Sequence, residues 1–183
     1  MGEEDLRFTP TKTGEGGGAA SAQRDVIVAE PYPLRSGTPA PSFTLPRSPH
    51  AAVSLADLRR RRAILVFYPA DFEPVTEELL RLYQDELAEF DRLGASLVAV
   101  STDHTWSHTA FARAVGIHFP LLADAHSQGA VSRAYGAYDE KAGACSRAIF
   151  VLDERGVIYW CQTYPVGVNP GVDGILTALE AMG

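Results

Sequence analysis

The feature that most constrains the fold is a pair of continuous apolar runs on either side of a segment with helical periodicity. The runs are Ala63–Tyr68 (AILVFY) and Ser96–Ser101 (SLVAVS), and both are typical of central strands buried on both faces of a sheet. Between them, apolar residues recur at spacings of three and four, and Gly94 offers a left-handed stop. These periodic residues are Leu79, Leu80, Tyr83, Leu87, Phe90 and Leu93. The pattern predicts two buried strands joined by one helix that ends at Gly94.

The following segments continue the alternation of helices and short strands. The patterns predict a helix over Thr105–Val115, a strand over His118–Leu122 and a helix that opens at Ser127 and ends near Tyr135. Alternating strands and helices are typical of an α/β fold with helices packed on a sheet. We therefore expect a helix-covered sheet from Gly37 onward.

The C-terminal part carries a hairpin signal and a closing helix. Ala148–Leu152 and Val157–Tyr164 flank the sequence DERG, whose final glycine suits a left-handed hairpin position. These two strands are expected to pair in antiparallel fashion. Asn169 as N-cap and Pro170 at the first helical position predict a last helix. The residues that this helix would bury are Ile175, Leu176, Leu179 and Met182.

Residues 1–35 differ in composition from the rest of the chain. They mix Gly, Ala, Ser, Thr and charged residues, and a segment such as Glu15–Ser21 (EGGGAAS) buries too little apolar surface to offset its ordering entropy. We predict a disordered N-terminal arm over residues 1–35 and one folded domain over residues 36–183. Within the arm, Asp25–Ala29 (DVIVA) is either an isolated edge strand or an adhesive apolar segment.

Charge and hydropathy exclude several functions. The 16 basic and 23 acidic residues give a net charge of -7, which argues against nucleic acid as a partner. The longest apolar stretch, Ala63 to Pro74, contains two acids and is too short to span a membrane. The N-terminus lacks the apolar core of a secretory signal, so a cytoplasmic location is expected. In that reducing compartment Cys145 and Cys161 should be free thiols.

The strand-to-helix junction FYPADFEPVTEELLRLYQ (67–84) and six further segments resemble peroxiredoxins of the alkyl hydroperoxide reductase and thiol-specific antioxidant family. They cover nearly all of residues 37–183 in the family's order. The resemblance implies a thioredoxin-like, peroxiredoxin-type fold, with a mixed central sheet and helices on both faces. The matching segments are GTPAPSFTLP (37–46), VSLADL (53–58), FYPADFEPVTEELLRLYQ (67–84), SLVAVSTD (96–103), FPLLAD (119–124), SRAIFVLDERGVI (146–158) and PVGVNPGVDGIL (165–176).

The active-site pattern of that family is matched only in part. The pattern is P-x-x-x-T-x-x-C at the start of the first long helix, with an arginine on a later strand. Without gaps, Pro69 and Arg147 match, whereas Glu73 stands at the threonine position and Thr76 at the position of the peroxide-attacking cysteine. The resemblance therefore implies an antioxidant peroxidase site that lacks its nucleophile.

Threonine cannot replace that cysteine chemically. Peroxide reduction needs a polarisable thiolate that becomes a sulfenic acid and is then reduced by another thiol. An alcohol titrates near the roughly 15.7 of water and has no reversible oxidation ladder. With Glu73, Glu77 and Glu78 around it, Thr76 is predicted to be a helix N-cap. A replacement site with Glu73 as base and Thr76 as nucleophile has no visible oxyanion donors.

The two cysteines offer a second possibility. Cys145 lies two residues before Arg147, and alternate residues of a strand share a face. A relocated thiol at Cys145 is therefore conceivable if the strand begins early enough, whereas Cys161 is expected to be a small core or edge residue.

Two further groups of side chains are candidate sites. His104 and His108 are four residues apart and could share a helix face, as two metal ligands would, but exposed or capping histidines are the better interpretation. The run Arg59–Arg62 is interpreted as a solvated basic loop. No cofactor and no metal is implied.

The sequence leaves two functions open. The first is a redox-silent binding, scaffolding or assembly protein that pairs with itself or with an active relative. The second is a thiol-dependent peroxidase, an antioxidant oxidoreductase that reduces hydroperoxides through Cys145 or Cys161 with Arg147 and takes electrons from a thiol reductant.

Overall fold

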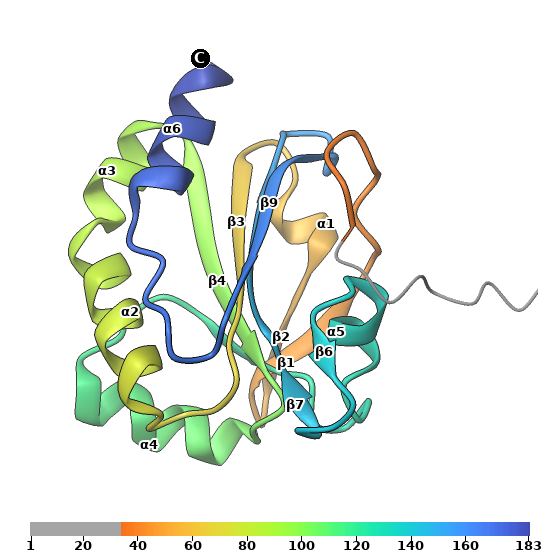
Figure 1. The fold of residues 1–183 in the computed structure, drawn as a ribbon, viewed down its shortest axis with the longest axis vertical. Helices are drawn as coiled ribbons and strands as arrows, with labels where there is room; N and C mark the ends of the chain where they lie inside the picture. Colours follow the sequence, from red (N-terminus) through yellow and green to blue (C-terminus); the bar gives the residue numbers. More distant parts are fainter. Residues whose placement is uncertain (1–33) are drawn as a thin grey trace, which may run out of the picture.

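The sequence folds into six helices and nine strands over residues 34–183, the part of the chain that the computed structural model describes (Figure 1). The strands are β1 (Thr44–Ser48), β2 (Ala51–Ser54), β3 (Arg62–Phe67), β4 (Ala95–Ser101), β5 (Leu121–Ala123), β6 (Tyr138–Asp139), β7 (Ala144–Cys145), β8 (Arg147–Leu152) and β9 (Ile158–Tyr164). The helices are α1 (Leu55–Leu58), α2 (Pro74–Asp85), α3 (Leu87–Arg92), α4 (Thr105–Val115), α5 (Ala130–Ala134) and α6 (Asp173–Ala181).

A mixed five-stranded sheet forms the centre, in the order β5-β4-β3-β8-β9. β3 pairs in parallel with β4, and β4 with β5, whereas β8 runs antiparallel to β3 and β9. In register, Ile64 of β3 lies between Leu97 of β4 and Val151 of β8. Every residue of β8 and all but the first of β3 are buried, as the continuous apolar runs predicted.

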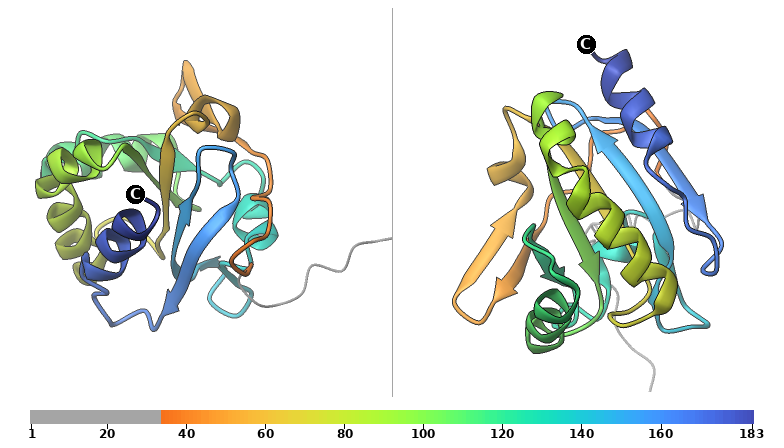
Figure 2. Two further views of the ribbon diagram at one scale, coloured as in Figure 1. Left: turned by 90° about the horizontal axis from the view of Figure 1, so that it is seen from above. Right: turned by 90° about the vertical axis from the view of Figure 1, so that its left-hand side faces the viewer.

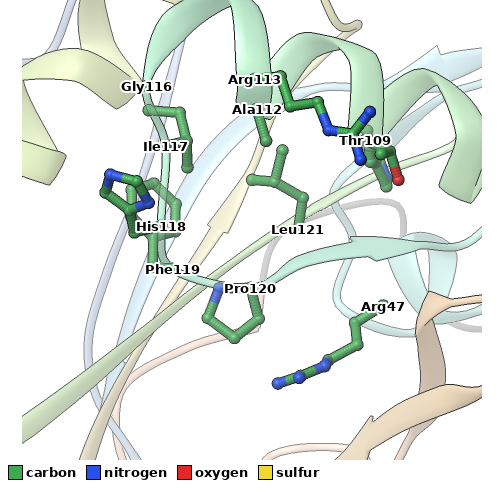
Figure 3. A pocket seen from close by; sticks show the side chains of 11 residues that line it. Arg47, Thr109, Ala112, Arg113, Gly116, Ile117, His118, Phe119, Pro120 and Leu121 are labelled. Atoms are coloured by element: carbon green, nitrogen blue, oxygen red, sulfur yellow. The ribbon is translucent and has the colours of Figure 1, made fainter.

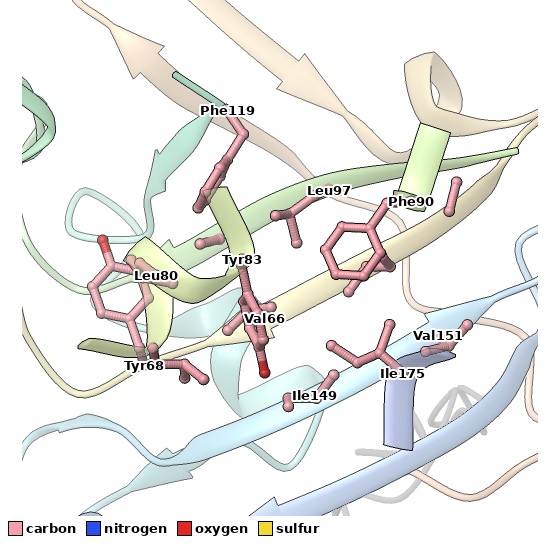
Figure 4. Close-up of a cluster of buried hydrophobic side chains, with 14 of the residues drawn as sticks. Val66, Tyr68, Leu80, Tyr83, Phe90, Leu97, Phe119, Ile149, Val151 and Ile175 are labelled. Atoms are coloured by element: carbon pink, nitrogen blue, oxygen red, sulfur yellow. The ribbon is translucent and has the colours of Figure 1, made fainter. Parts of the chain in front are cut away.

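Helices cover both faces of this sheet (Figures 1 and 2). On one face α2, α3, α4 and α6 pack on a core that includes Val66, Tyr83 and Phe90 (Figure 4). On the other face a second core contains Tyr135, which follows α5, packed against Phe67 with ring centroids 5.2 Å apart. The predicted α/β, thioredoxin-like architecture with a mixed sheet and helices on both faces is confirmed.

The helix predicted to end at Gly94 is two helices. α2 stops at Asp85, because Glu86 leaves the helical region with φ -90° and ψ 2°, and α3 begins at Leu87. Phe90 of α3 still packs on Tyr83 of α2, with ring centroids 6.2 Å apart, so the apolar periodicity continues across the break. Gly94 itself has φ 71°, the expected left-handed stop.

Two predicted helix starts were wrong. The Ser127 hydroxyl donates to Asp124 and does not accept from a helical amide, and α5 begins later, at Ala130. The side chain of Asn169 accepts from the amide of Gly171, and α6 begins later, at Asp173. In both cases a short polar side chain stabilises a local turn instead of the first helical turn.

Other boundaries agree more closely with the sequence. α4 spans the predicted residues, and β8 and β9 form the predicted antiparallel hairpin. The strand expected over residues 118–122 is β5, which starts at Leu121; the amide of His118 donates instead to the side chain of Gln84, at 2.7 Å.

The run Arg59–Arg62 is not a uniformly solvated loop. Arg62 begins β3, and its guanidinium donates to the carbonyls of Leu93, Leu179 and Met182 at 3.3, 2.9 and 2.9 Å. These acceptors lie at the ends of α3 and α6, so Arg62 satisfies carbonyls that helix ends leave unpaired. The other members of the run are exposed or half-exposed.

The predicted arm, residues 1–35, falls outside the described residues except for its end. The amide of Leu34 donates to the Tyr135 carbonyl at 3.4 Å. The strand-like segment Asp25–Ala29 also lies outside the described part. Within residues 34–183, no helix combines the length and the apolar character needed to cross a membrane.

Candidate functional site at the start of α2

The loop after β3 leads into the N-terminus of α2. Pro69 lies in this loop, half-buried, and Glu73 is the residue before the helix. The Glu73 carboxylate accepts from the amides of Val75 and Thr76 at 3.1 and 2.7 Å. Glu73 is therefore the N-cap and Pro74 the first helical residue, with its fixed φ suited to that position. The prediction that Thr76 is the N-cap was wrong, because Thr76 is already inside the helix.

The Thr76 side chain is fully buried beneath this cap. Its hydroxyl donates to the Glu73 carboxylate with an Oγ1–Oε2 distance of 2.7 Å, and none of its surface is exposed. The hydroxyl is thus the donor to a carboxylate and has no approach from solvent.

Arg147 reaches the same carboxylate from the sheet. Phe67 at the end of β3 is in register with Ala148 of β8, so Arg147 lies just beyond the end of β3, where the loop toward α2 departs. Its Nη2 donates to Glu73 at 2.8 Å and to the carbonyl of Val166 at 2.9 Å. Thr76 Oγ1 is 3.5 Å from the same nitrogen. The geometry brings Glu73, Thr76 and Arg147 together in one cluster.

This cluster is an anion site filled by the protein itself. Arg147 is fully buried, and its Nη1 has no hydrogen-bond partner among the described residues. Partial burial raises the pKa of Glu73, but the hydrogen bonds from Thr76, Val75 and Arg147 outweigh it and hold that pKa below its ordinary value. At neutral pH the cluster therefore contains a carboxylate that faces a guanidinium and a helix N-terminus.

Cys145 does not lie on the strand that carries Arg147. β8 begins at Arg147, and Cys145 belongs to the short strand β7. It packs in the core on the opposite face of the sheet, where its sulfur is 3.0 Å from the Ser132 hydroxyl. Burial raises the pKa of the Cys145 thiol to about 12. The condition that would bring this sulfur beside Arg147, an early start of the strand, is not met.

Cys161 is half-buried on the edge strand β9. Its thiol donates to the Leu34 carbonyl at 2.7 Å, and desolvation raises its pKa. Both cysteines are free.

A buried polar network, missed by the sequence analysis, lies beneath the loop before α2. His108 is 2% exposed, so the expectation of an exposed or capping histidine was wrong for this residue. Its Nδ1 is 3.0 Å from the Asp71 carboxylate, to which the Tyr68 hydroxyl donates at 2.9 Å. His104 is exposed and precedes α4 without a side-chain capping bond. Residues 34–183 contain no cluster of side chains suited to a metal ion.

The mixed sheet with helices on both faces is of the thioredoxin-like class, and in this chain a strand arginine also faces the N-terminus of α2. The AhpC/TSA family matches residues 36–161. The chain belongs to this family.

Individual relatives agree with that assignment. The peroxiredoxin of Thermoplasma volcanium is 30% identical over 156 residues, which cover 82% of this chain and 75% of the relative. Alkyl hydroperoxide reductase E of Mycobacterium tuberculosis is 35% identical over 130 residues, 70% of this chain and 85% of the relative.

Solved structures give the same result for the fold. The crystal structure of Enterococcus faecalis AhpC is similar with a TM-score of 0.74 and 28% identity, over 80% of this chain and 91% of that chain. The reduced 2-Cys peroxiredoxin of Plasmodium vivax matches with a TM-score of 0.74 and 23% identity, over 82% of each chain.

Proposed function

We propose that this AhpC/TSA-family protein lacks the usual peroxidatic reaction and acts as a redox-silent binding or assembly protein. The family pattern, laid on the chain without gaps, assigns Thr76 to the position of the attacking cysteine and Glu73 to that of the motif threonine. One observation carries the proposal: the Glu73 carboxylate is 2.8 Å from Arg147. The guanidinium expected to face a peroxide is thus paired with a side chain of the same protein.

The chemistry of Thr76 supports the same conclusion. A thiolate attacks one oxygen of a peroxide, breaks the O–O bond and becomes a sulfenic acid. The Thr76 hydroxyl is buried and already donates a hydrogen bond to the Glu73 carboxylate. An alcohol in this position can neither form a sulfenic acid nor be regenerated by a thiol.

The proposed role requires a partner, either a second copy of this chain or an active relative. Two large aromatic side chains support a contact surface, because Phe72 and Trp106 are 53% and 73% exposed. Nucleic acid and membrane are not proposed as partners, and the proposed location is the cytoplasm. Sedimentation velocity should detect a dimer of the isolated chain, or a complex after mixing with an active relative. A monomer in both experiments would contradict the assembly role.

The decisive experiment treats the reduced full-length chain with stoichiometric hydrogen peroxide in the presence of dimedone, which traps sulfenic acids. Mass spectrometry after seconds should find neither a dimedone adduct nor a disulfide. Rapid oxidation would instead support the thiol-dependent peroxidase that works through Cys145 or Cys161 with Arg147. The variants Cys145→Ser and Cys161→Ser would then identify the reacting sulfur.

A further inference from the structure

A cavity lies away from the Glu73 cluster, between α4, β1 and the segment that leads into β5. Its volume is about 540 Å³, within the range of small-molecule sites. Its lining includes Arg47, His108, Ala112, Arg113, Pro120 and Leu121. Of the site residues described above, only His108 of the buried polar network lines the cavity, and no member of the Glu73 cluster does.

The charge of this cavity has one sign. Arg47 comes from β1, Arg113 from α4 and His118 from the loop after α4, and no acidic residue belongs to the lining. Neither arginine forms an ion pair with any residue of the described part. In a chain of net charge -7, two arginines without an ion pair among residues 34–183 thus border one cavity from separate elements.

The space between these cations is apolar. Figure 3 shows Arg113 and Arg47 on opposite sides of Leu121 and Pro120, with the Ala112 side chain close to Leu121. An anion with a flat apolar body could therefore cover this floor while its charged group pairs with the guanidinium at one side.

His108 supplies a second, independent observation. Its ring lines the cavity and is 2% exposed. Nδ1 is held by Asp71 at 3.0 Å, whereas Nε2, on the far side of the ring, has no hydrogen-bond partner among residues 34–183. Unpartnered buried polar atoms are rare in folded proteins and indicate an absent partner.

We propose that this cavity binds a small organic anion, a carboxylate or sulfonate on an apolar body. Arg113 or Arg47, which flank the floor, pairs with the charged group, and Ala112, Pro120 and Leu121 contact the body. The site is separate from the Glu73 cluster, so it does not depend on whether the protein reduces peroxides.

The test is an NMR titration of the ¹⁵N-labelled full-length chain with 2-naphthoate, and with 2-naphthamide as its uncharged counterpart. Saturable shifts should concentrate on the amides of residues 112–122, with a Kd of about 1 mM or tighter. The amide counterpart should bind at least about fivefold more weakly, because it lacks the charge.

Variants distinguish a built site from a general attraction of anions. Arg47→Gln with Arg113→Gln should weaken the binding of 2-naphthoate by roughly tenfold, because no guanidinium then remains on either side of the floor to pair with the carboxylate. Arg81→Gln is the matched control, since Arg81 is a half-exposed arginine on α2, and its Kd should match that of the unmodified chain. Absence of saturation up to about 10 mM, shifts centred elsewhere, or equal Kd values in the double variant and the control would each overturn the proposal.

Discussion

Replacing Glu73 by glutamine tests the ion pair at the start of α2. The substitution keeps the size of the side chain and one carbonyl oxygen, but it removes the charge that faces Arg147. Arg147 is fully buried and would retain only neutral acceptors, namely the amide oxygen at position 73, the Val166 carbonyl and the Thr76 hydroxyl. A lost charged hydrogen bond costs about 1.5–3 kcal/mol, and the buried charge left without its partner raises the cost further. We expect the free energy of unfolding to fall by about 2–4 kcal/mol.

The assay is urea unfolding at pH 7, followed by circular dichroism. Glu77→Gln is the control, because Glu77 forms an exposed pair with Arg81 on the same helix, and such pairs contribute about 0.3–0.5 kcal/mol. Glu73→Gln combined with Arg147→Met should recover most of the loss, since neither buried charge then lacks a partner. A loss below about 0.5 kcal/mol in Glu73→Gln, or no recovery in the double variant, would refute the argument.

The same pair predicts a dependence on pH. The pKa of Glu73 is lower in the folded protein than its ordinary value, because hydrogen bonds from Thr76, Val75 and Arg147 outweigh the effect of burial. A carboxylate of this kind stabilises the fold fully above the ordinary glutamate pKa of about 4.3. The contribution is lost as the pH falls through the lower, folded value. The free energies of unfolding of the unmodified chain and of Glu73→Gln should therefore converge as the pH is lowered from 7 to 3. A difference that stays constant over this range would contradict the predicted direction of the pH dependence.

Three further predictions concern the site and the fold. Thr76→Cys with Glu73→Thr should create a thiol that reduces hydrogen peroxide at least about tenfold faster than free cysteine. The rate is measured by stopped flow, with Glu73→Thr alone as the control variant. A rate equal to that of free cysteine would mean that the surroundings of Arg147 no longer activate a thiol. In the unmodified folded chain, Ellman's reagent at pH 8 should modify half-buried Cys161 well before Cys145, whose pKa is raised to about 12 by burial, and the reverse order would be inconsistent with the burial. Arg62→Met should lower the free energy of unfolding by about 2–4 kcal/mol, because carbonyls at the ends of two helices lose their donor, and urea unfolding with a loss below about 0.5 kcal/mol would count against it.

The sequence predicted the sheet well, because burial on both faces leaves a signal in the residues themselves. Ala63–Tyr68 and Ser96–Ser101 contain no charged residue, and each overlaps one of the two adjacent central strands β3 and β4. Helix boundaries were weaker, since a short polar residue such as Ser127 can cap a helix or close a turn.

The candidate site was predicted as a set of positions but not as a geometry. The helix cap is Glu73 because Pro74 fixes the first turn, and that proline was a usable signal in the sequence. The burial of His108 had no such signal, because its partner Asp71 belongs to a loop 37 residues away in the chain. Such a contact depends on how the loop packs on α4, and a local sequence pattern carries no information about that packing.

The tether between Glu73 and its own backbone determines which molecules can reach Arg147. The Glu73 carboxylate is held beside Arg147 by the protein chain, so it competes with dissolved anions for the guanidinium. Its effective concentration there is above the millimolar levels at which such anions are present. Phosphate, bicarbonate or a free organic acid would therefore have to displace a competitor that never diffuses away. Raising the concentration of an external ligand has little effect on such an arrangement, whereas a change at residue 73 removes the competitor in one step.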